Sequence, residues 1–202
     1  MRTSRGFTLV ELLVVIAIIG ILSSIVMVAL GGAKEKSRDS KRLADMASIK
    51  LALALYYNDN YMYPKNIYGT GAAAPDSGLA PLYLPVVPRD PKANPAGEDC
   101  ASNNVNSFAS CYHYYGLKKS SGLCDAGAKS PVLYHLAAAF EDISNSALAQ
   151  DIDADATLSN YGSGYSACGS PAPSSFDGNQ PSCKTAALYN RSLPDPCYDV
   201  TP

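Results

Sequence analysis

The chain has 202 residues, of which 47% are hydrophobic and 17% are charged, and its formal net charge is −2. This length allows one domain together with a separate helix, or at most two small domains. The charge is unevenly distributed, with +4 over residues 1–50 and −6 over residues 51–202. The basic excess lies on a predicted helix and the rest of the chain is acidic, so the charge pattern does not indicate a nucleic-acid binder.

A nearly uninterrupted apolar segment begins at Phe7 and ends at Gly32, with Glu11 as its one acidic residue. As a helix it would be roughly 39 Å long, which is enough to cross a hydrocarbon core of about 30 Å. The six residues before it carry two basic side chains, Arg2 and Arg5, and no acidic one. Because positive charge stays on the cytoplasmic side of a membrane, we expect the chain after residue 32 to lie outside the cytoplasm.

The position of Glu11 separates three interpretations of this segment. A carboxylate inside a membrane helix costs about 2.5–3.5 kcal/mol on insertion scales, so it usually marks a function. A plain membrane anchor gains nothing from this acid, and a secretory signal peptide would have an apolar region of only about 7–15 residues. Cleavage after Gly6 would instead give Phe7 a free amine, which Glu11 of a neighbouring subunit can neutralise when the helices bundle.

Residues 6–11, with the sequence GFTLVE, and the apolar segment after them resemble the prepilin signature of type IV pilins and their pseudopilin relatives. The resemblance implies that a prepilin peptidase removes residues 1–6 by cutting between Gly6 and Phe7, and that Phe7 is then methylated. It also implies that residues 7–32 form the transmembrane and filament-core helix, with Glu11 and Gly20 as assembly residues. Val28 stands where many type IV pilins carry a proline.

Residues 33–60 are predicted to form an amphipathic spine helix that continues the first one. Gly31 and Gly32 are expected to weaken it, since glycine costs about 1 kcal/mol relative to alanine, and Pro64 follows its expected end near Tyr57. One face carries apolar side chains at three- and four-residue steps: Leu43, Met46, Ile49, Leu53 and Tyr56. The other face carries charges that we expect to be mostly solvated: Lys34, Lys36, Arg38, Asp39, Lys41, Arg42, Asp45 and Lys50.

Residues 61–202 are predicted to form an extracytoplasmic globular pilin domain. The segment 56–64, together with 78–82 and 87–91, is similar to the major pseudopilins of type II secretion and to pilins built like them. We expect residues 66–97 to cross the helix as a loop, with a short helical turn near residues 79–84. Strands are predicted at 111–116 and 131–140, with a turn at 118–122. The predicted fold is therefore α+β, a long helix against a small antiparallel sheet of two to four strands.

All six cysteines lie after the membrane segment, and an even number outside the cytoplasm indicates disulfides. Three disulfides would staple the loop-rich C-terminal region, although fifteen pairings are open and a metal–thiolate site is the weaker alternative. The candidates are Cys100, Cys111, Cys124, Cys168, Cys183 and Cys197.

Alternate carboxylates at Asp151, Asp153 and Asp155 suit a hard cation such as calcium. The resemblance adds that major pseudopilins hold calcium in the loop after their last strands. The EF-hand pattern fails here, because Ala156 and Gly162 stand where it needs glycine and glutamate. The alternative is a solvated acidic loop.

Phosphate-binding, zinc-protease and nucleophile-elbow motifs do not occur in the sequence, so we expect neither an enzyme nor any cofactor beyond calcium. We predict a structural subunit of a type IV pilus-like filament that serves motility, adhesion or DNA uptake. Its partners would be copies of itself, minor pilins, the prepilin peptidase and an inner-membrane assembly platform. It would span the cytoplasmic membrane once before assembly and lie on the cell surface afterwards. The alternatives are a type II secretion pseudopilin in a periplasmic piston and a minor, tip-located binding pilin.

Overall fold

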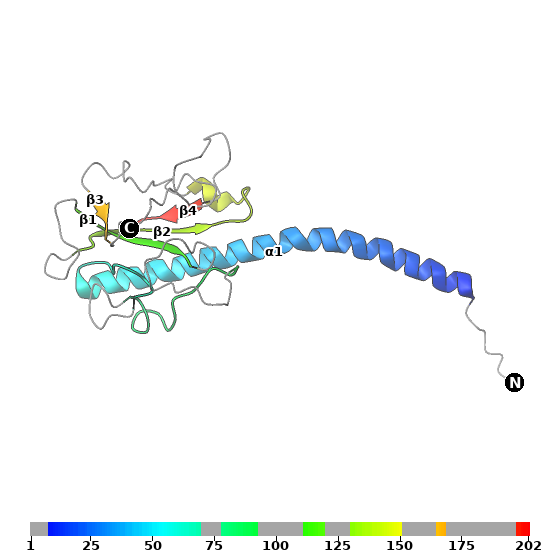
Figure 1. Ribbon diagram of the computed structural model, residues 1–202, viewed down its shortest axis with the longest axis horizontal. Coiled ribbons are helices and arrows are strands. Elements are labelled where there is room, and N and C mark those ends of the chain that lie inside the picture. The colour runs from blue at the N-terminus through cyan, green and yellow to red at the C-terminus, as the bar shows by residue number, and fades with distance from the viewer. Residues whose placement is uncertain (1–7, 70–77, 93–110, 120–129, 151–164, 169–196) are drawn as a thin grey trace. The chain divides into compact units, whose positions relative to one another are not determined.

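The computed structural model describes residues 8–69, 78–92, 111–119, 130–150, 165–168 and 197–202. Figure 1 shows one long helix and a small sheet. The elements in chain order are α1 (Leu9–Asn60), β1 (His113–Lys119), β2 (Leu133–Ala139), the 3-10 helix η1 (Ser146–Gln150), β3 (Tyr165–Ala167) and β4 (Cys197–Val200). The predicted α+β class is confirmed. The chain divides into two compact units, residues 1–37 and residues 38–202, and each is described by itself.

Helix α1 has 52 residues and is continuous through Gly31 and Gly32. The expected weakening at these two glycines therefore does not break it. The helix ends at Asn60, the last residue of the predicted spine helix 33–60, and is followed by Tyr61 in the left-handed region with φ 55°. The Tyr61 N–H donates to the Tyr57 carbonyl at 2.8 Å. A left-handed residue at this position is a common way for a helix to end.

The sheet has the strand order β3-β1-β2-β4, and every neighbouring pair is antiparallel. Tyr115 is opposite His135 in the central pair. Both predicted strands are confirmed, whereas β3 and β4 lie in a region where no regular structure is expected from sequence. The predicted turn at 118–122 is wrong for Lys118 and Lys119, because both belong to β1 and pair with β3.

The core of the second unit lies between the sheet and the second half of α1 (Figure 1). The predicted apolar stripe is confirmed, since Met46, Ile49, Leu53 and Tyr56 are fully buried and Leu43 is partly buried. Fully burying a large apolar side chain contributes about 1.5–3 kcal/mol, so this stripe holds the helix to the sheet. Alternate side chains of the sheet, together with the residue just before β1, belong to the same cluster: Tyr112, Tyr114, Tyr134, Leu136, Ala138 and Val200.

The loop after α1 completes this core. Ile67 and Leu79 are fully buried in it, and the Leu79 N–H donates to the Ile67 carbonyl at 3.0 Å. The Tyr83 N–H donates to the Leu79 carbonyl at 2.9 Å, so the helical turn predicted near residues 79–84 is confirmed. The Asn60 side-chain amide donates to the Tyr83 hydroxyl at 3.0 Å, which fixes the loop against the C-terminal end of α1.

Gly116 in β1 lies where the fold leaves no room for a side chain. A Cβ atom there would lie 2.5 Å from Cγ of Pro131 and 2.7 Å from the carbonyl oxygen of Pro64. Gly116→Ala is therefore expected to destabilise the second unit by about 1–3 kcal/mol, as overpacking does. Denaturant unfolding of the full chain in detergent measures this loss. Gly32→Ala is the control, because nothing lies within 4 Å of its added Cβ. A loss no larger than that of the control would contradict the packing argument.

Candidate functional site

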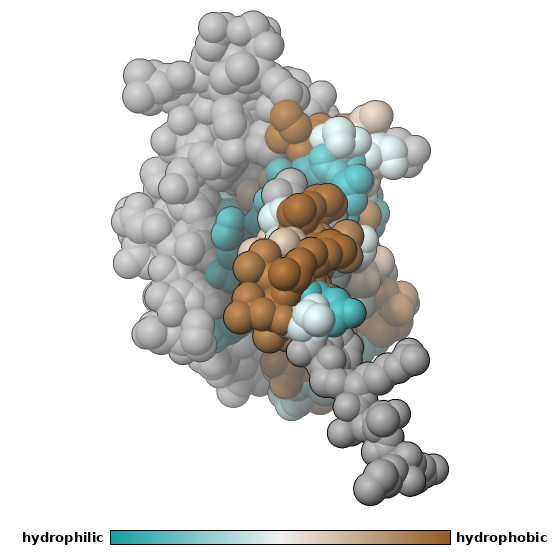
Figure 2. All heavy atoms as spheres, turned by 90° about the vertical axis from the view of Figure 1, so that its right-hand side faces the viewer, coloured by the Kyte–Doolittle hydropathy of each residue, from teal (hydrophilic) through white to brown (hydrophobic). Residues whose placement is uncertain are grey.

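The first half of α1 presents an apolar surface to its surroundings. Every side chain from Thr8 to Met27 is exposed, and Figure 2 shows the apolar ones as a brown surface. The helix is long and apolar enough to cross a membrane, and none of its most apolar 18-residue window is buried within the chain. A surface of this size needs lipid or another apolar surface to cover it.

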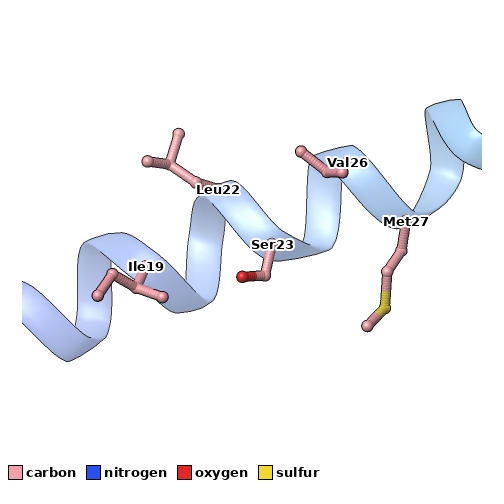
Figure 3. Close-up of a pocket in the computed structure, with 5 residues that line it drawn as sticks. All are labelled: Ile19, Leu22, Ser23, Val26 and Met27. Carbon is pink, nitrogen blue, oxygen red and sulfur yellow. The ribbon is translucent and has the colours of Figure 1, made fainter.

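A hollow on this surface is lined by five residues of α1, drawn in Figure 3. Ile19, Ser23 and Met27 point to one side of the helix, and Leu22 and Val26 point to another. Ser23 supplies the single hydroxyl group. Because all five residues come from one helix, the hollow is an open groove between side chains. Its chemistry fits an apolar side chain of a neighbouring helix better than a polar small molecule.

Thr8 and Glu11 form the N-terminal cap of α1. The Thr8 backbone N–H and hydroxyl each donate to Oε2 of Glu11 at 2.8 Å, and the Thr8 hydroxyl oxygen accepts the Glu11 N–H at 3.2 Å. This reciprocal pattern is a capping box. It holds the Glu11 carboxylate at the positive end of the helix dipole. Gly6 and Phe7 lie outside the described residues, so cleavage between them and methylation of Phe7 stay predictions.

Gly20 lies at an open point of the helix surface. No atom comes within 4 Å of a Cβ built there. The hydroxyl of Ser24, four residues later, donates to the Ile21 carbonyl of its own helix at 2.7 Å, so its polar group is satisfied within α1. Small residues of this kind let two helices approach closely in a membrane. The role of Gly20 in assembly stays a prediction.

The second half of α1 carries a buried cluster of charges that sequence reasoning missed. The Arg42 side chain is 2% exposed and Asp39 is fully buried, so the expectation of a solvated face is wrong for both. Arg42 Nη1 donates to Asp39 Oδ1 at 2.6 Å and to Glu141 Oε1 at 3.0 Å. Its Nε and Nη2 atoms donate to the two carboxylate oxygens of Asp90 at 2.7 and 2.9 Å.

Glu141, directly after β2 and Phe140, joins this cluster from the sheet side. It accepts a two-point hydrogen bond from Arg38, with distances of 2.6 and 2.7 Å, and a further one from Lys92 at 3.2 Å. The backbone N–H groups of Glu141 and Asp142 donate to the Asp39 carboxylate. We call Arg38, Asp39, Arg42, Asp90, Lys92 and Glu141 the ion cluster. It ties α1 to the 78–92 loop and to the chain after β2.

The ion cluster predicts a loss of stability in acid. Hydrogen bonding from Arg38, helped by Lys92 and Arg42 and opposed by burial, lowers the pKa of Glu141 from 4.5 to about 2. A carboxyl group whose pKa is lowered on folding stabilises the fold above its unfolded pKa and loses that contribution as pH falls towards its folded pKa. The unfolding free energy should therefore fall between about pH 5 and pH 2. Glu141→Gln should flatten that fall in a denaturant titration across pH, and an unchanged slope would contradict the assignment.

Only some of the residues predicted to form disulfides or to bind calcium are among those that the structure describes. Cys111, Cys168 and Cys197 are each disulfide-bonded, and there is no free cysteine among the residues described. Cys100, Cys124 and Cys183 lie outside this part of the chain, so the pairing stays open. Asp151, Asp153 and Asp155 also lie outside it. In the part that the structure describes, no group of three or more His, Cys, Asp or Glu residues could hold a metal ion.

Comparison with known proteins gives two concordant results. The family model described as the prokaryotic N-terminal methylation motif matches residues 1–30. Type II secretion system core protein G of Aeromonas hydrophila is 39% identical over an alignment of 102 positions that covers 46% of this chain and 71% of that protein. The protein of the same name from Escherichia coli K12 is 39% identical over 45% of this chain and 68% of its own length, and that from Vibrio cholerae is 37% identical over 46% and 69%. No solved structure matches.

Proposed function

The chain belongs to the family of type II secretion system core protein G, and from this premise we propose that it is the repeating subunit of a periplasmic pseudopilus. In this proposal the filament acts as a piston in protein secretion. The subunit spans the cytoplasmic membrane once before assembly. The prepilin peptidase cuts it between Gly6 and Phe7 and methylates Phe7, and the assembly platform then draws it into the filament.

One observation carries this proposal. Every side chain from Thr8 to Met27 is exposed and most are apolar, and the one carboxylate among them, Glu11, is held at the N-terminal end of α1. Lipid covers that surface in the free subunit, and copies of the same helix cover it in a filament. Glu11 then meets the Phe7 amine of a neighbour, and Gly20 lets the helices approach. The family assembles with itself and is not a family of enzymes.

The relatives favour a role in secretion. The first prediction from the sequence alone was instead a surface pilus. Their names refer to type II secretion, and motility, adhesion and DNA uptake have no support among them. The expectation of a cell-surface filament is therefore replaced by a periplasmic one. This chain nevertheless extends well beyond the matched part, which is less than half of its length.

The test is to delete the gene for this chain in its own host and to restore the gene from a plasmid. Loss of the chain should leave secreted proteins in the periplasm, and restoration should return them to the medium. N-terminal mass spectrometry should find methylated Phe7, and electron tomography should find short periplasmic filaments. Long surface fibres with normal secretion would favour a pilus instead, and an intact Met1 would contradict the family mechanism.

In this proposal the six cysteines form three disulfides, and these order the loop-rich C-terminal region. The bonded state of Cys111, Cys168 and Cys197 supports it. A disulfide contributes typically about 2–4 kcal/mol by restricting the unfolded chain. Peptide mapping without reduction should recover three linked pairs, and any stoichiometric free thiol would count against this part of the proposal.

Calcium at Asp151, Asp153 and Asp155 is the remaining part of the proposal. Its support is the alternation of three carboxylates, which suits an oxygen-ligated cation. Removing calcium with a chelator should lower the melting temperature of the full chain, because a ligand that binds only the folded state stabilises it. An unchanged melting temperature would remove calcium from the account.

A further inference from the structure

Three disulfide-bonded cysteines lie at separate places on the sheet. Cys168 directly follows β3, and its N–H donates to the Gly116 carbonyl of β1 at 2.7 Å. Cys197 is the first residue of β4 and pairs with Ala139 of β2. Cys111 comes two residues before β1. Because all three are bonded, their positions restrict which cysteines can be their partners.

The strand order keeps these three cysteines apart from one another. The Cα atoms of two bonded cysteines lie at most about 6.8 Å apart. Cys168 and Cys197 lie on opposite edges of the sheet, three strand spacings or about 14 Å apart. Cys111 and Cys197 lie on the two sides of β2, about 10 Å apart. Cys111 precedes Gly116, the neighbour of Cys168, by five residues or about 16 Å of strand.

Each of the three therefore bonds a cysteine outside the described residues. There are also three of those: Cys100, Cys124 and Cys183. Each of them is used once, so Cys124 bonds Cys111, Cys168 or Cys197. The fifteen pairings that six cysteines allow are thereby reduced to six, with three choices for the first described cysteine and two for the second.

The length of the chain decides which of the three Cys124 can reach. Cys124 is five residues after Lys119, the last residue of β1. Five residues span at most about 18 Å when fully extended. A disulfide adds at most about 6.8 Å, so the Cα atom of the partner lies within about 25 Å of the Lys119 Cα atom.

Only Cys168 lies within that distance. It is beside Gly116, three residues before Lys119, and so lies about 11 Å from Lys119. Cys111 precedes Lys119 by eight residues, which is about 26 Å along the strand direction. Cys197 lies at the same end of the sheet as Cys111 and two strands away from β1, which makes its separation from Lys119 about 28 Å.

We propose that Cys124 and Cys168 form a disulfide that fastens β3 to the connection between β1 and β2. The proposal rests on the three disulfides of the proposed function and is independent of the filament. Strand β3 has three residues and lies at an edge of the sheet, so a covalent bond holds a strand that has few hydrogen bonds of its own. The two thiols lose two electrons and two protons as the bond forms. A disulfide of an extracytoplasmic thiol oxidant accepts them and becomes two thiols.

The test is peptide mapping of the full, unreduced chain. Trypsin and a protease that cleaves before aspartate release Cys124 in residues 120–124 and Cys168 in residues 155–176, and the cut at Asp177 separates Cys183. We expect these two peptides to be recovered as one linked pair. A bond from Cys124 to any other cysteine would overturn this inference and leave three disulfides and the filament standing. A free thiol at Cys124 would overturn the three disulfides as well.

Paired substitutions give a second measurement in the full chain in detergent. Cys124→Ser and Cys168→Ser should each lower the melting temperature by roughly 5–15 °C. Both changes together should lower it no further, because they remove the same bond. Cys124→Ser with Cys111→Ser is the control, since it removes two bonds and should lower the melting temperature about twice as far. Equal losses from the two double variants would overturn the pairing.

Discussion

Replacement of Glu11 by alanine is expected to leave the chain inserted and processed in the membrane but unassembled. In a filament the Glu11 carboxylate would neutralise the Phe7 amine of a neighbour among apolar helices. Removing one partner of a buried ion pair costs about 3–5 kcal/mol, because the other charge stays uncompensated. This corresponds to a fall of roughly a hundredfold or more in assembly. Filament yield from sheared or tomographically counted material measures it.

The effect of Glu11→Ala on the charge can be separated from its effect on the helix. Alanine is the best helix former, so the substitution does not break α1. It does remove the bonds from the Thr8 backbone N–H and hydroxyl to Glu11. Glu11→Gln separates the two effects, since its amide oxygen can still accept from Thr8 but carries no charge. Assembly lost in both variants assigns the role to the charge, whereas assembly restored in Glu11→Gln assigns it to the cap. Normal filament yield from Glu11→Ala would contradict the pairing.

Local sequence patterns were sufficient to predict the helix and half of the sheet. Helix α1 and its stripe from Leu43 to Tyr56 follow from a regular spacing that depends on neighbours three or four residues away. Strands β1 and β2 have seven residues each and are rich in aromatic or apolar side chains. Strands β3 and β4 have three and four residues. Segments so short carry too little periodicity to be identified, and pairing with β1 and β2 defines them instead.

The ion cluster shows why charged positions were harder to predict than apolar ones. Asp39 and Arg42 lie on the same side of the helix as the apolar Met46. This shared side indicates that the two charged side chains are buried. Their remaining partners, Asp90 and Glu141, follow Arg42 by 48 and 99 residues. A single sequence does not reveal contacts across such separations. The charges were therefore expected to face solvent, and only the folded chain shows that they hold three segments together.

Replacement of Arg42 by methionine is expected to destabilise the folded unit strongly. Methionine fills a similar volume, so the loss comes from charge and not from a cavity. Asp39 is fully buried. It would keep its hydrogen bonds from the N–H groups of Glu141 and Asp142 but would lose its bond to Arg42. Asp90 would lose a two-point hydrogen bond. Breaking a buried pair in this way costs about 3–5 kcal/mol.

Lys41→Met is the matched control, one residue away. The Lys41 side chain is 55% exposed and pairs with Asp45 one helical turn later at 3.1 Å. Exposed pairs of this spacing contribute about 0.3–0.5 kcal/mol, so denaturant unfolding of the full chain in detergent should separate the two variants clearly. Adding Asp39→Asn to Arg42→Met should recover part of the loss, because it removes the buried negative charge that Arg42 no longer balances. Equal losses from Arg42→Met and Lys41→Met would show that the cluster is solvated, and that the loops are held to α1 by apolar packing alone.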